Sequence, residues 1–174
     1  MRLYRFSPIE NKDQLLKAIK YIHFACFKLC DQIFGEYLPV AGNIGVFCHY
    51  DGEYKFLTNL REELTDQSDN FNQKYYRLHN PIIIPAKANI PEAVYTYIYI
   101  RKPDPYRGQT GDGDFVLEPV KYAELKKSIL DGKRIKGARI FERPEDDMIE
   151  LYDPDIDALA FITTSKISEK VTRI

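Results

Sequence analysis

The chain has 174 residues, with 25 lysines and arginines against 26 aspartates and glutamates, and so a formal net charge of −1. At roughly 150 residues per domain this length predicts a single domain, and a chain of this size can fold without metal or disulfide staples. The near-zero charge disfavours a dedicated nucleic-acid-binding protein, because such proteins usually carry a basic excess. The 13% content of aromatic residues excludes disorder over the whole length.

The sequence shows no signal for export or membrane insertion. Its longest strictly aliphatic run, the isoleucines at 82–84, is far shorter than the roughly 20 residues of a transmembrane helix. The first residues turn polar by Glu10, unlike a signal peptide. Three cysteines in no disulfide-like framework are typical of a reducing compartment. We therefore expect a cytoplasmic protein with no membrane partner.

The first predicted elements are a short strand and a long helix. Residues 2–7 alternate polar and apolar side chains, which favours a strand. Asn11 has the properties of an N-cap, and apolar residues then recur at three- and four-residue steps through residues 12–34. They occupy one narrow face, so this segment predicts an amphipathic helix, and Gly35 ends it.

The middle of the first half predicts a second helix between extended segments. Residues 44–49 form a short apolar run typical of a buried strand, and residues 53–64 place leucines and Phe56 at helical spacing. Two extended pieces follow at 74–78 and 82–84. Prolines beside the second piece favour an edge strand, because proline cannot donate to a sheet hydrogen bond.

The strongest strand pattern lies at residues 94–101. Its even positions are mostly aliphatic, and its odd positions include Tyr95, Tyr97 and Tyr99. A period of two places the aliphatic residues on one face and the tyrosines on the other. Since both faces are largely apolar, we expect a central strand covered on both sides. The tyrosine row could stack nucleobases or pack beneath the helix at 12–34.

The second half predicts one more helix and several short strands. In chain order these are a strand at 114–117, a helix at 120–130, strands at 138–141, 148–152 and 158–163, and a polar tail at 165–174 that we expect to fray. The order predicts one α+β domain over residues 1–174, with a mixed or antiparallel sheet packed against the long helix and two shorter helices. Residues 85–91 could link two subdomains.

The second half also resembles a known family. From Tyr97 onward the order is strand, helix and three strands, with Tyr122 on the helix and the turn Asp153-Pro154-Asp155 before the last strand. This order resembles the second βαβββ module of the vicinal-oxygen-chelate (glyoxalase-like) superfamily and covers residues 95–163. The resemblance implies that module's fold for this half of the chain.

The rest of the sequence departs from that family. The helices at 12–34 and 53–64 are not expected to repeat the module. The superfamily's last strand usually supplies a metal-binding glutamate, whereas residues 158–162 contain no carboxylate. We therefore expect no glyoxalase-type metal site, and fold analogy alone does not establish a function.

Our leading site prediction is the glycine-rich loop that follows the tyrosine strand, with Arg101, Asp104, Arg107, Asp112 and Asp114. Ligand sites often lie on loops at strand ends. The two arginines could bind phosphate or carboxylate. The aspartates could bind Mg²⁺ or exchange protons. Alternatively, these charges cap turns and pair with one another on the surface.

Two groups of thiols and imidazoles are further candidates. His23, Cys26 and Cys30 share one face of the long predicted helix and could bind Zn²⁺, or they could pack in the core, where free cysteine is frequent. Cys48 and His49 are adjacent on a strand and point to opposite faces. They therefore cannot form a nucleophile–base pair with each other.

Charge is segregated along the second half of the chain. Acidic residues concentrate at 145–157 and basic residues at 121–143. The leading hypothesis is a small cytosolic protein that binds a small anionic ligand at residues 101–114. The alternative is a non-enzymatic protein–protein interaction module that uses these patches, or the long helix if the monomer leaves it uncovered. No nucleophile–base set is visible, so the sequence leaves open an enzymatic role, a cofactor and a homo-oligomer.

Overall fold

A computed structural model describes residues 3–70, 72–142 and 147–172. Its helices are α1 (Lys12–Phe34), α2 (Asp51–Leu64), α3 (Pro119–Leu130) and α4 (Ser165–Thr172), and its strands are β1 (Val40–Phe47), β2 (Tyr76–Ile84), β3 (Ala93–Arg101), β4 (Gly111–Val116), β5 (Ala138–Phe141), β6 (Met148–Leu151) and β7 (Leu159–Thr163). The strands form one mixed sheet in the order β2-β3-β1-β4-β7-β6-β5. This is the α+β fold that the sequence predicts.

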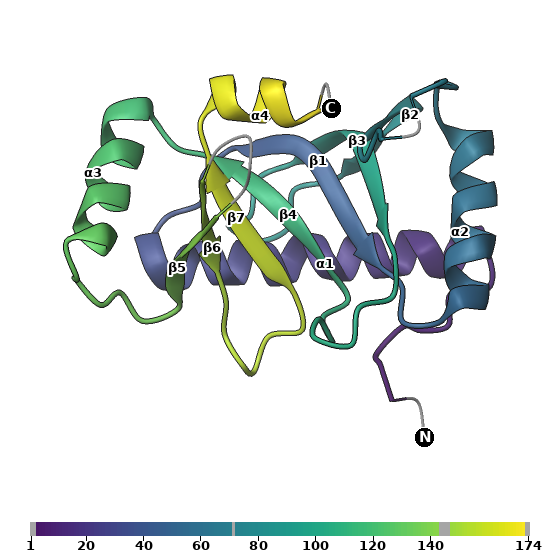
Figure 1. Ribbon diagram of the computed structural model, residues 1–174, viewed down its shortest axis with the longest axis horizontal. Coiled ribbons are helices and arrows are strands. Elements are labelled where there is room, and N and C mark those ends of the chain that lie inside the picture. Colours follow the sequence, from purple (N-terminus) through teal and green to yellow (C-terminus); the bar gives the residue numbers. More distant parts are fainter. Residues whose placement is uncertain (1–2, 71, 143–146, 173–174) are drawn as a thin grey trace.

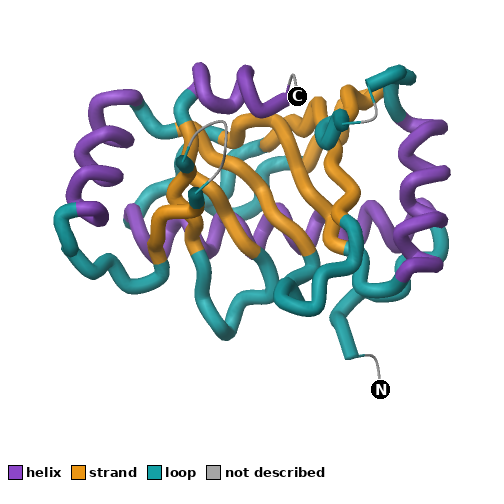
Figure 2. The backbone as a smooth tube through the Cα atoms, in the orientation of Figure 1, coloured by secondary structure: helices purple, strands orange, loops and turns teal. Residues whose placement is uncertain are grey.

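The helices surround the sheet unequally. Figures 1 and 2 show α1 crossing behind the sheet, α2 and α3 at its two ends, and α4 along its upper edge. The face turned away from α1 therefore has no long helix across it. The segment at 85–91 joins β2 to β3, which are neighbours in the same sheet. None of the helices in the described part of the chain is both long and apolar enough to span a bilayer.

The predicted long helix is confirmed, including its two ends. The side chain of Asn11 accepts a hydrogen bond from the backbone nitrogen of Gln14 at 2.9 Å, which caps the first turn. Gly35 adopts a left-handed conformation with φ of 66° and ends the helix. The apolar face of α1 is buried, and the helix packs on β1, β4, β6 and β7. It is therefore not the uncovered helix that the interaction alternative allowed.

The sheet consists of two similar halves joined at its centre. In the second half, β4 pairs parallel with β7, and β6 pairs antiparallel with both β7 and β5. This is a βαβββ module, but its first strand is β4 rather than the tyrosine strand. In the first half, β1 pairs parallel with β3, and β2 pairs antiparallel with β3. Within the described residues the first half thus has the order β1, α2, β2, β3, with α2 in the place of the module's helix and one strand fewer than the module.

The tyrosines of β3 do not share one face. Tyr95 is buried and its hydroxyl is hydrogen-bonded to His23 of α1. Ile98 is also buried in the main core, although an unbroken alternation would place it opposite Tyr95. The alternation therefore changes phase between these residues, and Tyr99 lines a cavity with Asp112 on the face away from α1. β3 is second from the edge of the sheet, not central, because β2 lies outside it.

Two predictions at the chain ends are wrong. Residues 3–6 form bends rather than a strand, and residue 2 lies outside the described residues. Side-chain contacts hold this segment: Tyr4 stacks on His49 with 3.8 Å between ring centroids, and Ser7 is hydrogen-bonded to His49. The tail expected to fray contains α4. Ile167 of this helix is buried, which supplies the apolar anchor that a short polar helix needs.

Glycines allow the central strands and α1 to approach closely. A methyl group at Gly111 would lie 2.1 Å from the carbonyl oxygen of Gly45 and 2.5 Å from the side chain of Ile22 in α1. A methyl group at Gly113 would contact Cys26 of α1 at 3.4 Å. The β1–β4 junction and the position of α1 thus depend on the small size of these residues.

We predict that Gly111→Ala lowers the free energy of unfolding by at least about 2 kcal/mol, because neither the backbone of Gly45 nor the packed Ile22 can move away easily. Urea denaturation measures this change. Gly52→Ala is the matched control: nothing lies within 4 Å of a methyl group at that helical position, so its stability should stay unchanged or rise slightly. Equal stabilities of the two variants would contradict the close packing.

The core also contains an uncharged histidine. His23 is fully buried, and this burial lowers its pKa from 6.5 to about 4. Above pH 6.5 the imidazole is neutral in both folded and unfolded chains. Below that pH the unfolded chain binds a proton that the folded chain does not accept until about pH 4. Acid therefore favours unfolding across this interval.

We predict that the free energy of unfolding falls by up to about 3 kcal/mol between pH 6.5 and pH 4 through His23 alone. Urea denaturation at several pH values measures this loss. His23→Gln keeps a polar partner for Tyr95 but does not titrate, so its stability should decline less steeply. An identical pH profile in the wild type and the variant would contradict the assignment.

Candidate ligand-binding site

The arginines of the predicted loop site have separate partners. Arg101 ends β3, and its guanidinium pairs with Asp104 at 2.6 Å. The same guanidinium lies over the ring of Phe47, 4.8 Å from its centroid. Arg107 extends instead to β6 and pairs with Glu150 at 3.1 Å. The two arginines therefore do not form one clamp.

The two aspartates of the predicted site lie on β4 rather than in the loop. A methyl group at Gly45 would lie 2.1 Å from the Oδ1 atom of Asp112, so this carboxylate covers the backbone of β1. Asp114 is buried and accepts a hydrogen bond from the side-chain amide of Asn43 at 2.8 Å. Since alternate residues of a strand share a face, and Gly113 between them faces α1, both aspartates lie on the face away from α1.

Arg101 and Asp104 line a groove of about 760 Å³ between α2 and the end of β3. Its charged lining residues are four cations and one carboxylate: Arg61, Lys74, Arg101, Lys102 and Asp104. The lining thus carries a net positive charge of 4 − 1 = +3. Such a volume is within the range of small-molecule sites, about 300–1,000 Å³.

The wall of the groove on α2 comes from residues that the sequence analysis did not single out. Tyr54, Thr58 and Arg61 are spaced by four and three residues, which places them on one side of the helix. Leu57, on another side, is fully buried. This polar and aromatic stripe is the one sequence feature that could have pointed to a site on α2. That it faces Arg101 is visible only in the folded chain.

Arg61 is held in a fixed position. Its guanidinium carbon lies 3.7 Å from the centroid of the Tyr76 ring, and only 13% of its side chain is exposed. Within the described residues its one ion pair is a 3.8 Å contact with Glu62, whose side chain is 67% exposed. Stacking on an aromatic ring therefore orients this cation without neutralising it.

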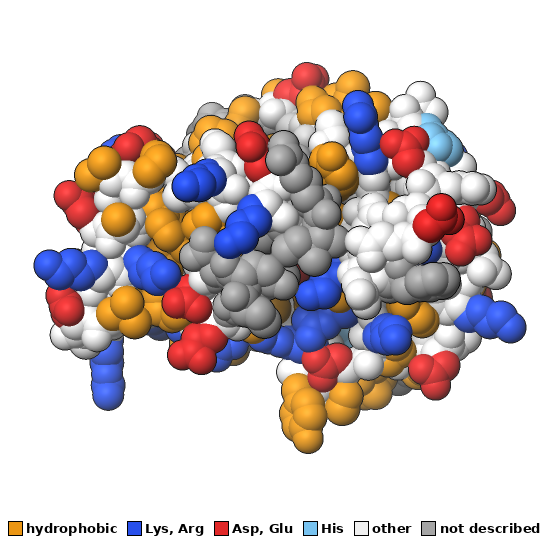
Figure 3. Space-filling model, turned by 45° about the horizontal axis from the view of Figure 1, so that its top comes forward, with side chains coloured by type: hydrophobic (Ala, Val, Ile, Leu, Met, Phe, Trp, Pro, Cys, Tyr) orange, Lys and Arg blue, Asp and Glu red, His pale blue; other side chains and the backbone are white. Residues whose placement is uncertain are grey.

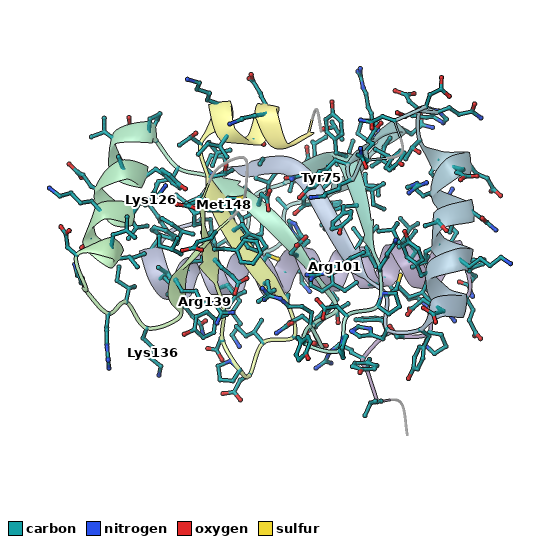
Figure 4. The ribbon with its side chains drawn as sticks, viewed as in Figure 1. Tyr75, Arg101, Lys126, Lys136, Arg139 and Met148 are labelled. Carbon is teal, nitrogen blue, oxygen red and sulfur yellow. The ribbon has the colours of Figure 1, made fainter. Side chains whose placement is uncertain are left out.

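A smaller cavity of about 290 Å³ adjoins the groove on the face of the sheet away from α1. The two share Lys74, Tyr99 and Arg101. Figure 4 shows Arg101 and Tyr75 on the front of the sheet, with α1 behind. Asp112 and Phe161 line the far side of this cavity. Arg101 is thus the residue of the predicted site that both cavities use.

A buried ion cluster lies beyond this cavity. Glu150 on β6 has a fully buried side chain and pairs with both Arg107 and Arg139. The Nε atom of Arg139 donates to it at 2.8 Å. Arg107 therefore links the loop after β3 to the second half of the sheet. Its positive charge is paired with the buried carboxylate of Glu150.

The thiols and imidazoles lie in the core or support the chain near its start. Cys26 and Cys30 are buried, and burial raises the pKa of both thiols, that of Cys30 to about 11. Burial also raises the pKa of Cys48 and lowers that of His49. Among the described residues no three histidine, cysteine or acidic side chains are grouped to hold a metal ion. These cysteines are therefore packing residues.

The segregated charges partly neutralise one another. Lys126 of α3 pairs with Asp147 at 3.4 Å, and Arg139 pairs with Glu150, so each contact joins the basic stretch to the acidic one. Figure 3 shows basic and acidic side chains interspersed at the end of the molecule that carries α3. Arg143, Glu145 and Asp146 lie outside the described residues.

Comparisons with known proteins define the fold only. No family model matches the sequence, and no curated protein matches it. A solved structure described as "Structural Genomics, Protein EC4020" has a TM-score of 0.50 at 12% identity and covers 99% of this chain and 97% of its own. A Streptomyces coelicolor methylmalonyl-CoA epimerase variant with 2-nitronate-propionyl-CoA has a TM-score of 0.31 at 13% identity and covers 72% of this chain and 98% of its own.

We predict that Arg107→Gln lowers the free energy of unfolding by about 2–3 kcal/mol, because it leaves the buried Glu150 with one cationic partner. Arg5→Gln is the matched control, since Arg5 pairs with Asp157 at the surface with 55% of its side chain exposed. That change should cost at most about 1 kcal/mol. Urea denaturation of both variants measures the difference, and equal losses would contradict a structural role for Arg107.

Proposed function

We propose that this protein binds a small anionic ligand in the groove between α2 and the end of β3. The observation that carries the proposal is the +3 charge of the groove lining, with a single carboxylate among its charged residues. A concave site with one sign of charge concentrates ligands of the opposite sign. The orientation of Arg61 on Tyr76 adds a guanidinium that is already positioned for a carboxylate or a phosphate.

The aromatic residues of the groove indicate the shape of the ligand. Tyr54, Tyr76 and Tyr99 come from α2, β2 and β3 and line the groove together with the cations. Tyrosine rings offer large apolar surfaces that pack against flat or hydrophobic groups. A ligand with an acidic group and a planar ring would use both kinds of residue, so an aromatic carboxylate is the first class to test.

We also infer a fold relationship to the vicinal-oxygen-chelate superfamily, supported by the connectivity of β4, α3, β5, β6 and β7. The metal chemistry of that superfamily does not follow. β7 carries no carboxylate, and the described residues group no set of metal ligands. The proposal is therefore ligand binding and assigns no catalytic step.

Calorimetric titration with benzoate and phenyl phosphate, each against its neutral counterpart benzamide or phenol, tests this function. We expect the wild-type protein to bind at least one anion and neither neutral compound. Arg61→Gln and Arg101→Gln should each weaken that binding about tenfold or more, the loss of roughly one charge-assisted contact. Circular dichroism confirms that both variants fold.

Arg77→Gln is the control for charge alone. Arg77 is exposed on β2, next to Tyr76, but does not line the groove. Its substitution should leave the dissociation constant within about twofold of the wild type, because an exposed charge outside the site is screened by salt. Absence of anion binding, or an equal loss in all three variants, would refute the proposed site.

A further inference from the structure

A second basic surface lies at the opposite edge of the sheet from the groove. The loop between α3 and β5 forms a depression of about 550 Å³. Its four cationic lining residues are Lys133, Arg134, Lys136 and Arg139, and none of the described residues that line it is acidic. We call it the basic depression. β5 is the last strand of the sheet, whereas the groove lies at β3 and α2.

The backbone of the loop that carries the cations of the basic depression is constrained. Gly132 and Gly137 both have positive φ, 92° and 83°, and so form fixed turns at either side of the loop. The nitrogen of Lys133 donates to Ser128 at 3.0 Å, and that of Tyr152 donates to Gly137 at 2.9 Å. The backbone of the loop is therefore tied to both α3 and the end of β6, which fixes where its side chains leave the main chain.

Most of this positive charge is not neutralised inside the protein. Lys133, Arg134 and Lys136 are exposed and make no ion pair with any residue that the structure describes. Arg139 is paired with the buried Glu150, yet 53% of its side chain remains exposed. Figure 4 shows Lys136 pointing outward below α3, near Arg139. Like charges this close repel, so a multiply charged anion gains more here than a single charge does.

The floor of the basic depression is apolar and aromatic. Ile129 and Ile135 line it and pack against the main core. Tyr152 is 37% exposed, and the guanidinium of Arg139 lies 4.6 Å from its ring centroid. The ring of Tyr152 and the buried carboxylate of Glu150 together hold this guanidinium in a fixed plane.

We propose that the basic depression binds a ligand with two or more phosphate groups close together. The loop supplies three cations that have no ion pair among the described residues, Lys133, Arg134 and Lys136, and the exposed part of the Arg139 guanidinium lies beside them. The site is independent of the groove and does not rest on the function proposed for it. The same phosphate chemistry occurs in soluble polyphosphates and in the headgroups of phosphorylated lipids.

Calorimetric titration with inorganic tripolyphosphate tests the site, with Lys133→Gln/Lys136→Gln as the variant. Lys28→Gln/Lys121→Gln is the matched control, because it removes the same charge from exposed positions outside the depression. We expect the variant to weaken binding about tenfold or more and the control to change it less than about twofold. Wild-type binding should also weaken as salt is added.

Two further measurements separate this site from the groove and distinguish its ligands. Tripolyphosphate binding that is lost in Arg61→Gln but kept in Lys133→Gln/Lys136→Gln would overturn the proposal, as would no binding or equal binding by variant and control. Sedimentation with phosphatidylcholine vesicles that contain phosphatidylinositol bisphosphate then identifies the source. Sedimentation of the wild type but not the variant supports a lipid headgroup, and tripolyphosphate binding without sedimentation supports a soluble phosphate.

Discussion

Close contact between β1, β4 and α1 is the constraint on which the rest of the structure depends. The two halves of the sheet are joined through the pairing of β1 with β4. Gly111 has no room for a methyl group between Gly45 and Ile22, and Gly113 faces Cys26. The glycines therefore let one helix lie across both halves at short range. Residues with larger side chains would separate α1 from the sheet and move the halves apart.

This arrangement leaves one face of the sheet without a long helix across it. The groove and the smaller cavity meet on this open face. Arg101 ends β3 on this face and lies between the groove and the smaller cavity. Arg107, only six residues later, is used in the buried cluster with Glu150. Similar residues in one loop thus have different roles, because their neighbours in the fold differ. Positive charge stays exposed at both edges of the sheet, in the groove and in the basic depression.

Much of the fold could be predicted from local patterns. The helix at Lys12–Phe34 has a narrow apolar stripe with a cap at each end, and the strand at Ala138–Phe141 matches its prediction. The faces of the tyrosine strand could not be predicted from its sequence. Its residues look like a regular alternation, but the alternation of buried side chains changes phase between Tyr95 and Ile98. The C-terminal helix is stable through the burial of Ile167, a contact that its polar sequence does not reveal.

The candidate site was predictable only in part, because it depends on contacts between distant segments. Arg101 was a reasonable choice at the end of a strong strand. Arg61 belongs to a helix about forty residues away, and its stacking on Tyr76 appears only after folding. A charge count along one loop cannot show which charges pair internally. Which charges pair is decided by the contacts of the loop with distant elements, with Glu150 of β6 for Arg107 and with the groove beside α2 for Arg101.

NMR spectroscopy of the guanidinium groups tests whether the fold brings Arg61 and Arg101 together as an anion site. The side-chain Nε–H signals of these arginines and the backbone signals of residues 99–104 are followed while benzoate is added. We expect these signals to shift together along one saturation curve while the signal of Arg77 stays fixed. Shifts scattered over all arginines, or none at Arg61, would contradict it.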